Sequence, residues 1–155
     1  MPPSVVQLNL PYYPLKIRDV SDKRQIFDCI RRRYVALTPE EWVRQNMVAH
    51  LIESLGVPST RISNETPIIY NGLVKRCDTV VYDAALQPLM IVEYKAPTVE
   101  ITQRVFDQIA VYNLRLQVPY LLASNGLTHI FCKVDLQNKR YLFRPDLPHY
   151  EELLR

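Results

Sequence analysis

The alternation of apolar and polar residues predicts that the chain starts with short strands and continues with a long helix. Two strands, at about residues 15–18 and 25–28, are predicted around the turn Ser21-Asp22-Lys23. A helix start follows in Thr38-Pro39-Glu40-Glu41, with an N-cap threonine, a proline at the first helical position and a glutamate at the third. We expect this helix to end at Gly56-Val57-Pro58.

One face of this helix is apolar at the helical spacing. Its members are Val43, Met47, Val48, Leu51, Ile52 and Leu55. Glu41 and Arg44 fall within the same stripe. Glu41 either closes a capping box with Thr38 or faces an acidic site beyond the helix start. For Arg44, a local ion pair with Glu41 or Glu40 is the alternative to a functional role.

The middle of the chain predicts three strands joined by short turns, which is typical of an antiparallel meander. They lie within residues 61–70, 73–82 and 89–95. Pro67 is expected to break or bend the first strand. A helix over about residues 99–117 then leads to a strand at 120–124, which predicts a parallel pair with a right-handed crossover. Two more strands are predicted at 128–135 and 140–143.

These elements predict an α/β fold with a mixed sheet, an antiparallel meander plus a β-α-β crossover, flanked by helices. We expect residues 1–37 to form an N-terminal hairpin extension and residues 38–155 to form the main domain. The chain has 155 residues, of which 48% are hydrophobic and 23% charged, so a folded chain is expected and a disordered one is excluded. The net charge of +3 permits a polyanionic partner without requiring one.

Several function classes are excluded by what the sequence lacks. It has no apolar run long enough to span a membrane, no secretory signal in its first residues and no GxxxxGK[ST] motif of a nucleotide motor. Its three cysteines, Cys29, Cys77 and Cys132, are far apart, which favours reduced thiols in a cytoplasmic protein.

Charged residues inside the predicted sheet are the first candidate chemistry. Glu93 and Lys95 share one face at the end of a strand that is otherwise apolar on both faces. Asp78 lies inside the preceding strand, and a short turn brings it beside Glu93. Two neighbouring carboxylates repel each other unless a divalent cation lies between them. The alternative is a salt bridge, Asp78–Lys95 or Glu93–Arg76.

The second helix places a polar residue next to an apolar stripe. The stripe is formed by Ile101, Val105, Ile109, Tyr112 and Leu116. Gln108 lies at its margin, one turn before Tyr112. A glutamine facing the core requires several hydrogen-bond partners. The alternative is an amide that is bonded to water or to local backbone.

Together, Asp78, Glu93-Tyr94-Lys95 and Gln108…Tyr112 form the ordered pattern D…ExK…QxxxY. This pattern resembles the PD-(D/E)XK nuclease superfamily, and its QxxxY element is similar to that of type I restriction enzyme R-subunit nucleases. Nearly the whole chain resembles stand-alone proteins with the R-protein N-terminal nuclease domain. The segments that carry this resemblance are 37–45, 75–78, 93–97 and 106–110, together with Ile26-Phe27-Asp28.

The sequence departs from this family pattern in two places. Cys77 stands where the superfamily has a proline before the aspartate, and the chain shows no translocase motor. The resemblance therefore implies a restriction-endonuclease-like fold and nuclease chemistry, without DNA translocation.

The resemblance also implies a role for each residue of the site. Asp78, Glu93 and the backbone carbonyl of Tyr94 would hold Mg²⁺, or Mn²⁺, and Glu41 would hold a metal-bound water. Lys95 would orient or deprotonate the attacking water, or stabilise charge on the phosphate. Gln108 and Tyr112 would position Lys95 or contact DNA, and we expect Gln108 to lie within hydrogen-bond reach of Lys95, directly or through one water.

We therefore expect a Mg²⁺-dependent DNA endonuclease with a role in restriction or phage defence. The alternative is a non-catalytic nucleic-acid-binding or interaction module with the same fold. DNA is the expected partner, and a homodimer or a partner subunit is a further expectation. The candidate DNA-contacting cations are Arg31, Arg32, Arg33, Arg44, Lys75 and Arg76. For the triplet 31–33, the alternative is a solvated basic stretch.

Overall fold

The computed structural model describes residues 5–155, so residues 1–4 of the predicted extension lie outside the described residues. The chain first forms an antiparallel sheet of three strands, β1 (Ile17–Val20), β2 (Lys23–Asp28) and β3 (Arg33–Ala36). The sequence predicted only the first two as a hairpin. The third strand arises from the basic triplet 31–33: Arg32 adopts φ +55° in the turn, and Arg33 begins β3.

The second sheet has six strands, ordered in space as they are in the sequence. They are β4 (Ile62–Tyr70), β5 (Leu73–Tyr82), β6 (Pro88–Tyr94), β7 (Tyr120–Ser124), β8 (His129–Asp135) and β9 (Arg140–Arg144). Only β6 and β7 are parallel; the other neighbours are antiparallel. The predicted meander followed by a β-α-β crossover is therefore confirmed.

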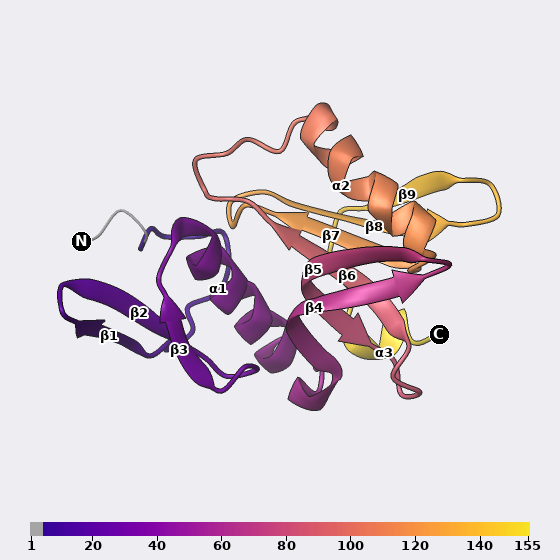
Figure 1. The fold of residues 1–155 in the computed structure, drawn as a ribbon. Coiled ribbons are helices and arrows are strands. Elements are labelled where there is room, and N and C mark those ends of the chain that lie inside the picture. Colours follow the sequence, from indigo (N-terminus) through magenta and orange to yellow (C-terminus); the bar gives the residue numbers. More distant parts are fainter. Residues whose placement is uncertain (1–4) are drawn as a thin grey trace.

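Helices cover both faces of this sheet (Figure 1). Helix α1 (Pro39–Glu53) lies between the three-stranded and the six-stranded sheet, and α2 (Gln103–Leu116) crosses the opposite face. A 3₁₀ turn, η1 (Ser59–Arg61), and a short helix, α3 (Tyr150–Leu153), were not predicted. Both are shorter than two helical turns, so they carry too little periodicity to be recognised in a sequence.

The hydrophobic core is divided by the sheet into two clusters. On the α1 side, Met47 and Leu51 pack against Met90 and Val92 of β6. On the α2 side, Ile91 of β6 packs with residues of α2. Because alternate residues of β6 serve the two clusters, β6 is the doubly covered central strand that the sequence predicted. Within residues 5–155, no helix is long and apolar enough to cross a membrane.

Helix α2 begins later than predicted and buries a different face. Thr102 is its N-cap, accepting a hydrogen bond from the Val105 N–H, so the helix begins at Gln103. Its buried residues are Phe106, Ala110, Asn113 and Leu116. The predicted apolar stripe therefore lies at the edge of the face that is actually buried, and one of its members, Tyr112, is 38% exposed.

Pro67 does not break β4, which runs continuously from Ile62 to Tyr70. As the edge strand of the sheet, β4 can accommodate a residue without an N–H. The irregularity lies at Glu65 instead, with φ +61°. The β4–β5 ladder pairs Asn64 with Thr79 and Thr66 with Cys77, with no pair between them. The division at residues 37 and 38 into extension and main domain stays a prediction.

Candidate active site

The predicted carboxylates lie side by side where β5 and β6 pass each other. Thr79 of β5 pairs with Val92 of β6, so the next step along the antiparallel strands brings Asp78 beside Glu93. The Tyr94 N–H donates a 2.9 Å hydrogen bond to Asp78 Oδ2, which fixes the Asp78 carboxylate against β6. The Lys95 N–H donates to the Ser124 carbonyl at 2.9 Å, so Lys95 continues the β6–β7 ladder.

The electrostatics of Glu93 reflect this arrangement. Burial, then the charge of Asp78 and a hydrogen bond with its carboxyl group, raise the pKa of Glu93 to about 8, while Lys75 and Lys95 lower it. The Lys75 ammonium lies 3.8 Å from Glu93 Oε1. The alternative salt bridges, Asp78–Lys95 and Glu93–Arg76, are not among the ion pairs of the described residues. Two carboxyl groups thus share a partly desolvated site, in which Lys75 and Lys95 offset part of their repulsion.

A cavity of about 160 Å³ opens from Glu93 toward α2. Its lining residues are Lys75, Glu93, Lys95, Val105, Gln108, Ile109 and Tyr112. The structure therefore brings the ExK strand and the QxxxY helix to one cavity. Lys75 also lies 5.3 Å above the Tyr112 ring, a cation–π arrangement that joins β5 to α2.

Gln108 enters this cavity from an exposed position on α2. Among the described residues, Gln108 and Lys95 form no direct hydrogen bond, so a contact through one water stays a prediction. The buried face of α2 is centred on Phe106 and Ala110, which leaves Gln108 outside the core. Gln108 is therefore available to a ligand in the cavity.

Glu41 is engaged away from this cavity. Its N–H donates to Thr38 Oγ1 at 3.1 Å, which is half of a capping box. Its carboxylate accepts hydrogen bonds from Arg31, Arg44 and Gln45 instead of returning to Thr38. Burial alone would raise the Glu41 pKa, but these hydrogen bonds and charges lower it. The predicted role in holding a metal-bound water is not supported, because the carboxylate is already occupied.

Two of the predicted DNA-contacting cations are likewise occupied inside the protein. Arg31 pairs with Asp28 and Glu41, and Arg44 pairs with Glu41 and Glu65. The alternative for Arg44, a local ion pair with Glu41, is confirmed, and we withdraw both arginines as DNA contacts because buried carboxylates hold their guanidinium groups.

The other predicted DNA-contacting cations lie nearer to solvent. Arg32 and Arg33 are exposed around the turn before β3. The Arg76 side chain is 71% exposed, and it pairs with Glu65 at 2.9 Å. Lys75 lies in the cavity itself. Arg32, Arg33, Lys75 and Arg76 remain candidate phosphate contacts.

The donor set at Asp78 and Glu93 fits a hard divalent cation. Carboxylate oxygens are the ligands that Mg²⁺ prefers, and Mg²⁺ usually keeps several waters. Residues 5–155 hold no convergent group of three or more His, Cys, Asp or Glu side chains, so a protein cage that excludes water is absent from this part of the chain. Two paired carboxylates match an ion that remains partly hydrated.

Sequence reasoning missed three buried polar residues next to this site: Asp28, Asn64 and Thr79. Thr79 Oγ1 donates to Asn64 Oδ1 at 2.7 Å, and Asn64 Nδ2 donates to Asp28 Oδ2 at 3.0 Å. One signal for two of them was available, because Asn64 and Thr79 are equally distant from the Asn71-Gly72 turn and so must face each other in the hairpin.

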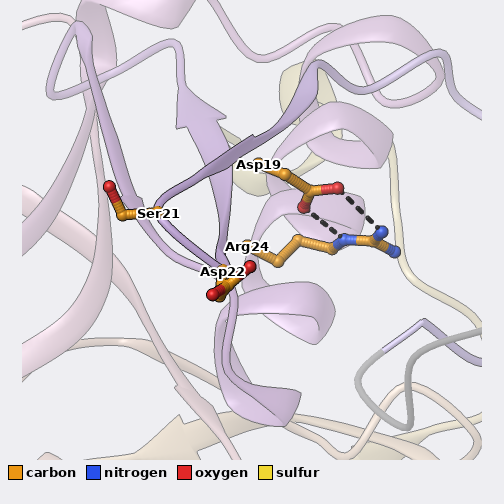
Figure 2. A pocket seen from close by; sticks show the side chains of 4 residues that line it. All are labelled: Asp19, Ser21, Asp22 and Arg24. Atoms are coloured by element: carbon orange, nitrogen blue, oxygen red, sulfur yellow. Dashed lines mark hydrogen bonds and ion pairs between the residues drawn. The ribbon is translucent and has the colours of Figure 1, made fainter.

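A larger pocket, of about 580 Å³, lies at the β1–β2 turn and offers no comparable chemistry; Figure 2 shows the side chains that line it. It is lined by Asp19, Ser21, Asp22 and Arg24. Arg24 donates two hydrogen bonds to the Asp19 carboxylate, at 2.8 and 3.1 Å, so the charges neutralise each other in solvent. The candidate active site is therefore identified by its paired carboxylates and not by the size of its cavity.

The mixed sheet with helices on both faces, and acidic residues at the end of its central strand, define a restriction-endonuclease-like α/β domain. Residues 39–148 match the family described as the type I restriction enzyme R protein N terminus. This match spans more than half of the chain, so the chain belongs to that family. The resemblance inferred from the D…ExK…QxxxY pattern is confirmed. No curated protein matches the chain.

A solved structure supports the fold. It is a fragment of a protein assigned as the HsdR subunit of a type I restriction enzyme from Vibrio vulnificus YJ016. The TM-score is 0.53 and the identity 18%, over 74% of this chain. The match covers 24% of that protein's chain, so this chain spans about a quarter of its length.

Proposed function

We propose that this protein is a Mg²⁺-dependent deoxyribonuclease that hydrolyses phosphodiester bonds in DNA. The observation that carries the proposal is that Glu93 and Lys95 share one cavity with the QxxxY side of α2, while Asp78 lies directly beside Glu93. Family membership supports the same chemistry. Mn²⁺ is a second suitable ion because it accepts the same oxygen ligands.

Each residue receives a role from its place in the site. Asp78, Glu93 and the Tyr94 carbonyl hold the ion, which when bound supplies Lewis-acid activation of water and stabilisation of the leaving oxygen. Lys95, in the same cavity as Glu93, orients or deprotonates the attacking water or stabilises charge on the phosphate. The water oxygen forms a new bond to phosphorus as the bond to the leaving oxygen breaks.

Three further residues of the cavity contact the substrate in this proposal. Gln108 and Tyr112 present an amide and an exposed aromatic ring beside Lys95, and Lys75 adds a cation. A phosphate entering the cavity therefore meets two lysines and a hydrogen-bond donor. These groups suit the DNA backbone rather than a particular base, so sequence preference is not expected from the cavity itself.

We also propose a role in restriction or phage defence, in the cytoplasm, with DNA as substrate and a second copy or a partner subunit completing the assembly. The support is the family, whose description places such domains in the R protein of type I restriction enzymes. DNA translocation is not part of the proposal, since residues 1–155 contain no P-loop motif.

The test is nicking of supercoiled plasmid in Mg²⁺ by wild type, Lys95→Ala and Lys133→Ala. Lys133 is a matched control, because it is an exposed lysine on β8 outside the cavity. We expect Lys95→Ala to lower the rate by about 10²- to 10⁴-fold, the range for removal of one acid–base or electrostatic group. Lys133→Ala should cleave at the wild-type rate.

Two outcomes would contradict the proposal. Equal activity of Lys95→Ala and wild type would show that the nicking does not come from this site. If the folded wild type binds DNA without Mg²⁺ and does not cleave it when Mg²⁺ is present, the alternative of a non-catalytic binding module is favoured.

A further inference from the structure

A closed ring of hydrogen bonds joins the N-terminal sheet to the two strands that carry the paired carboxylates. We call it the polar ring; its members are Asp28, Arg31, Glu41, Arg44, Asn64, Asp78, Thr79 and Tyr94. They come from β2 and the turn after it, α1, β4, β5 and β6. Six of the eight are buried, Arg31 and Asp78 being partly exposed. The bonds among the buried members are shielded from water, and those of Arg31 and Asp78 are partly shielded.

The first arc of the ring runs from β6 to the N-terminal sheet through side chains only. The Tyr94 hydroxyl donates to Thr79 Oγ1 at 2.9 Å, and Thr79 donates to Asn64 Oδ1 at 2.7 Å. Asn64 then donates through Nδ2 to Asp28 Oδ2 at 3.0 Å. Each group donates to the next, so the direction of every bond in this arc is fixed by its neighbours.

The second arc returns from the N-terminal sheet to β5 through two arginines. Arg31 bonds both the Asp28 carboxylate and Glu41 Oε1, the latter at 2.9 Å. Arg44 holds Glu41 in a bidentate pair at 2.8 and 2.9 Å. A third bond from Arg44, at 2.8 Å, reaches the backbone carbonyl of Asp78.

The ring closes at the proposed metal site. The Asp78 carboxylate accepts a hydrogen bond from the Tyr94 N–H at 2.9 Å. This bond between β5 and β6, the two strands that carry the paired carboxylates, closes the ring. Tyr94 lies between Glu93 and Lys95 in the sequence, with its hydroxyl held on the α1 side of the sheet while Glu93 and Lys95 line the cavity toward α2. The ring therefore anchors the backbone of the site from the opposite face.

We infer that Asp28, Asn64 and Thr79 are positioning residues of the Asp78–Glu93 site. This inference rests on the proposed function. Partners that orient metal ligands without touching the metal change affinity or activity by about 10- to 100-fold when they are removed. Anchoring matters here because ligand atoms must be held to within about 0.5 Å of the productive geometry.

The decisive experiment compares Thr79→Val with Thr79→Ser in the full chain. Valine keeps the shape of Thr79 and removes the hydroxyl that bridges Tyr94 and Asn64; serine keeps the hydroxyl and removes a methyl group. We expect Thr79→Val to weaken Mn²⁺ binding about 10-fold, measured by calorimetric titration and by the Mn²⁺-induced rise in melting temperature. Thr79→Ser should bind Mn²⁺ like the wild type, even where its melting temperature without metal is lower.

A second pair of variants keeps the test decisive if Thr79→Val does not fold. Tyr94→Phe removes the hydroxyl that starts the ring. Tyr150→Phe is the matched control, because Tyr150 is a buried tyrosine of the same core cluster whose hydroxyl donates to the Tyr82 carbonyl at 2.7 Å. We expect both to lower the melting temperature, and only Tyr94→Phe to weaken Mn²⁺ binding and plasmid nicking, by about 10-fold each.

The outcomes separate this inference from the proposed function. If the wild type binds no Mn²⁺ and does not cleave, the proposed function fails and the inference with it. If the wild type does both, while Thr79→Val and Tyr94→Phe bind Mn²⁺ as tightly as their controls, the polar ring is structural only and this inference alone is overturned.

Discussion

At the scale of single residues, the site brings together two carboxyl groups, Asp78 and Glu93, whose negative charges repel each other. Glu93 has a side chain that is only 13% exposed and lies against Asp78, so ionising both carboxyl groups is costly. Lys75 and Lys95 offset part of this cost. Such an arrangement contributes little to the stability of the metal-free protein, and it is the kind of strain that functional sites retain.

The residue-scale prediction concerns the stability of the metal-free protein as pH rises. The Glu93 pKa is about 8 in the folded protein against 4.5 for the ordinary group. Between these values the folded chain keeps a proton that the unfolded chain has released. The free energy of unfolding therefore falls as pH rises through this window, by at most about 1.4 kcal/mol per pH unit.

Urea unfolding in a chelating buffer at several pH values measures this loss. Glu93→Gln should flatten the pH dependence between about pH 5 and pH 8, because the amide does not titrate. Glu100→Gln is the matched control, since Glu100 is exposed in the loop before α2. A Glu93→Gln profile that is parallel to the wild type would contradict the prediction.

At the scale of elements, α2 connects the core to the cavity along one side. Phe106 and Ala110 pack on the sheet, while Gln108 and Tyr112, one turn apart, line the cavity beside β6. The helix can present these two residues to a ligand without exposing the core, because the cavity-lining and the buried residues occupy neighbouring stripes of one surface.

The element-scale prediction separates the function of Gln108 from its contribution to stability. Gln108 is exposed, so Gln108→Leu should change the free energy of unfolding by no more than about 0.5 kcal/mol. If Gln108 positions Lys95 or the phosphate, plasmid nicking should fall at least about 10-fold.

Gln103→Leu, on the exposed first turn of α2, is the control and should cleave normally. Nicking by Gln108→Leu at the wild-type rate would remove the QxxxY element from the proposed mechanism, even if the metal site survives.

At the scale of the whole molecule, buried charge connects the N-terminal sheet to the main sheet. Asp28 is completely buried, and it accepts hydrogen bonds from the backbone N–H groups of Ile30 and Arg31. Burial acts to raise its pKa, but the hydrogen bonds from the Arg31 backbone and from the Arg31 and Asn64 side chains, with the charge of Arg31, lower it overall. The ion pair of Arg31 with Glu41 thus crosses the predicted boundary between extension and domain.

The whole-molecule prediction follows from the lowered pKa of Asp28 in the folded protein. A carboxyl group with a lowered folded pKa stabilises the protein above its unfolded pKa of about 3.9, and this contribution is lost as pH falls through the folded pKa. Asp28→Asn should therefore cost about 3 kcal/mol at pH 7, because it removes the buried carboxylate that pairs with Arg31. The difference from wild type should shrink below about pH 4.

Urea unfolding at pH 7 and near pH 3 measures this change. Asp19→Asn is the matched control, because Asp19 also pairs with an arginine but on the exposed hairpin. No measurable change in stability is expected for Asp19→Asn. A loss for Asp28→Asn that persists unchanged at acid pH would show that its carboxylate charge is not what stabilises the junction.

The sequence by itself determined the parts of this protein that local rules control. The Thr38 N-cap and the apolar stripe placed α1, and Asn71-Gly72, with φ +47° and +79°, placed the β4–β5 hairpin. Alternation along β6 predicted that Glu93 and Lys95 share a face, and the hairpin put Asp78 beside Glu93. Each of these depends on neighbours in the chain or on one short turn.

Only the tertiary structure decided which polar groups meet across elements. Arg31, Arg44 and Glu41 carry charges suited to DNA or metal, and the sequence offered no means to see that Arg31 pairs with Glu41 or that Arg44 pairs with Glu65. The reason is physical: burying a charge requires a partner, and that partner comes from whichever element packs nearest, however distant it is in the sequence.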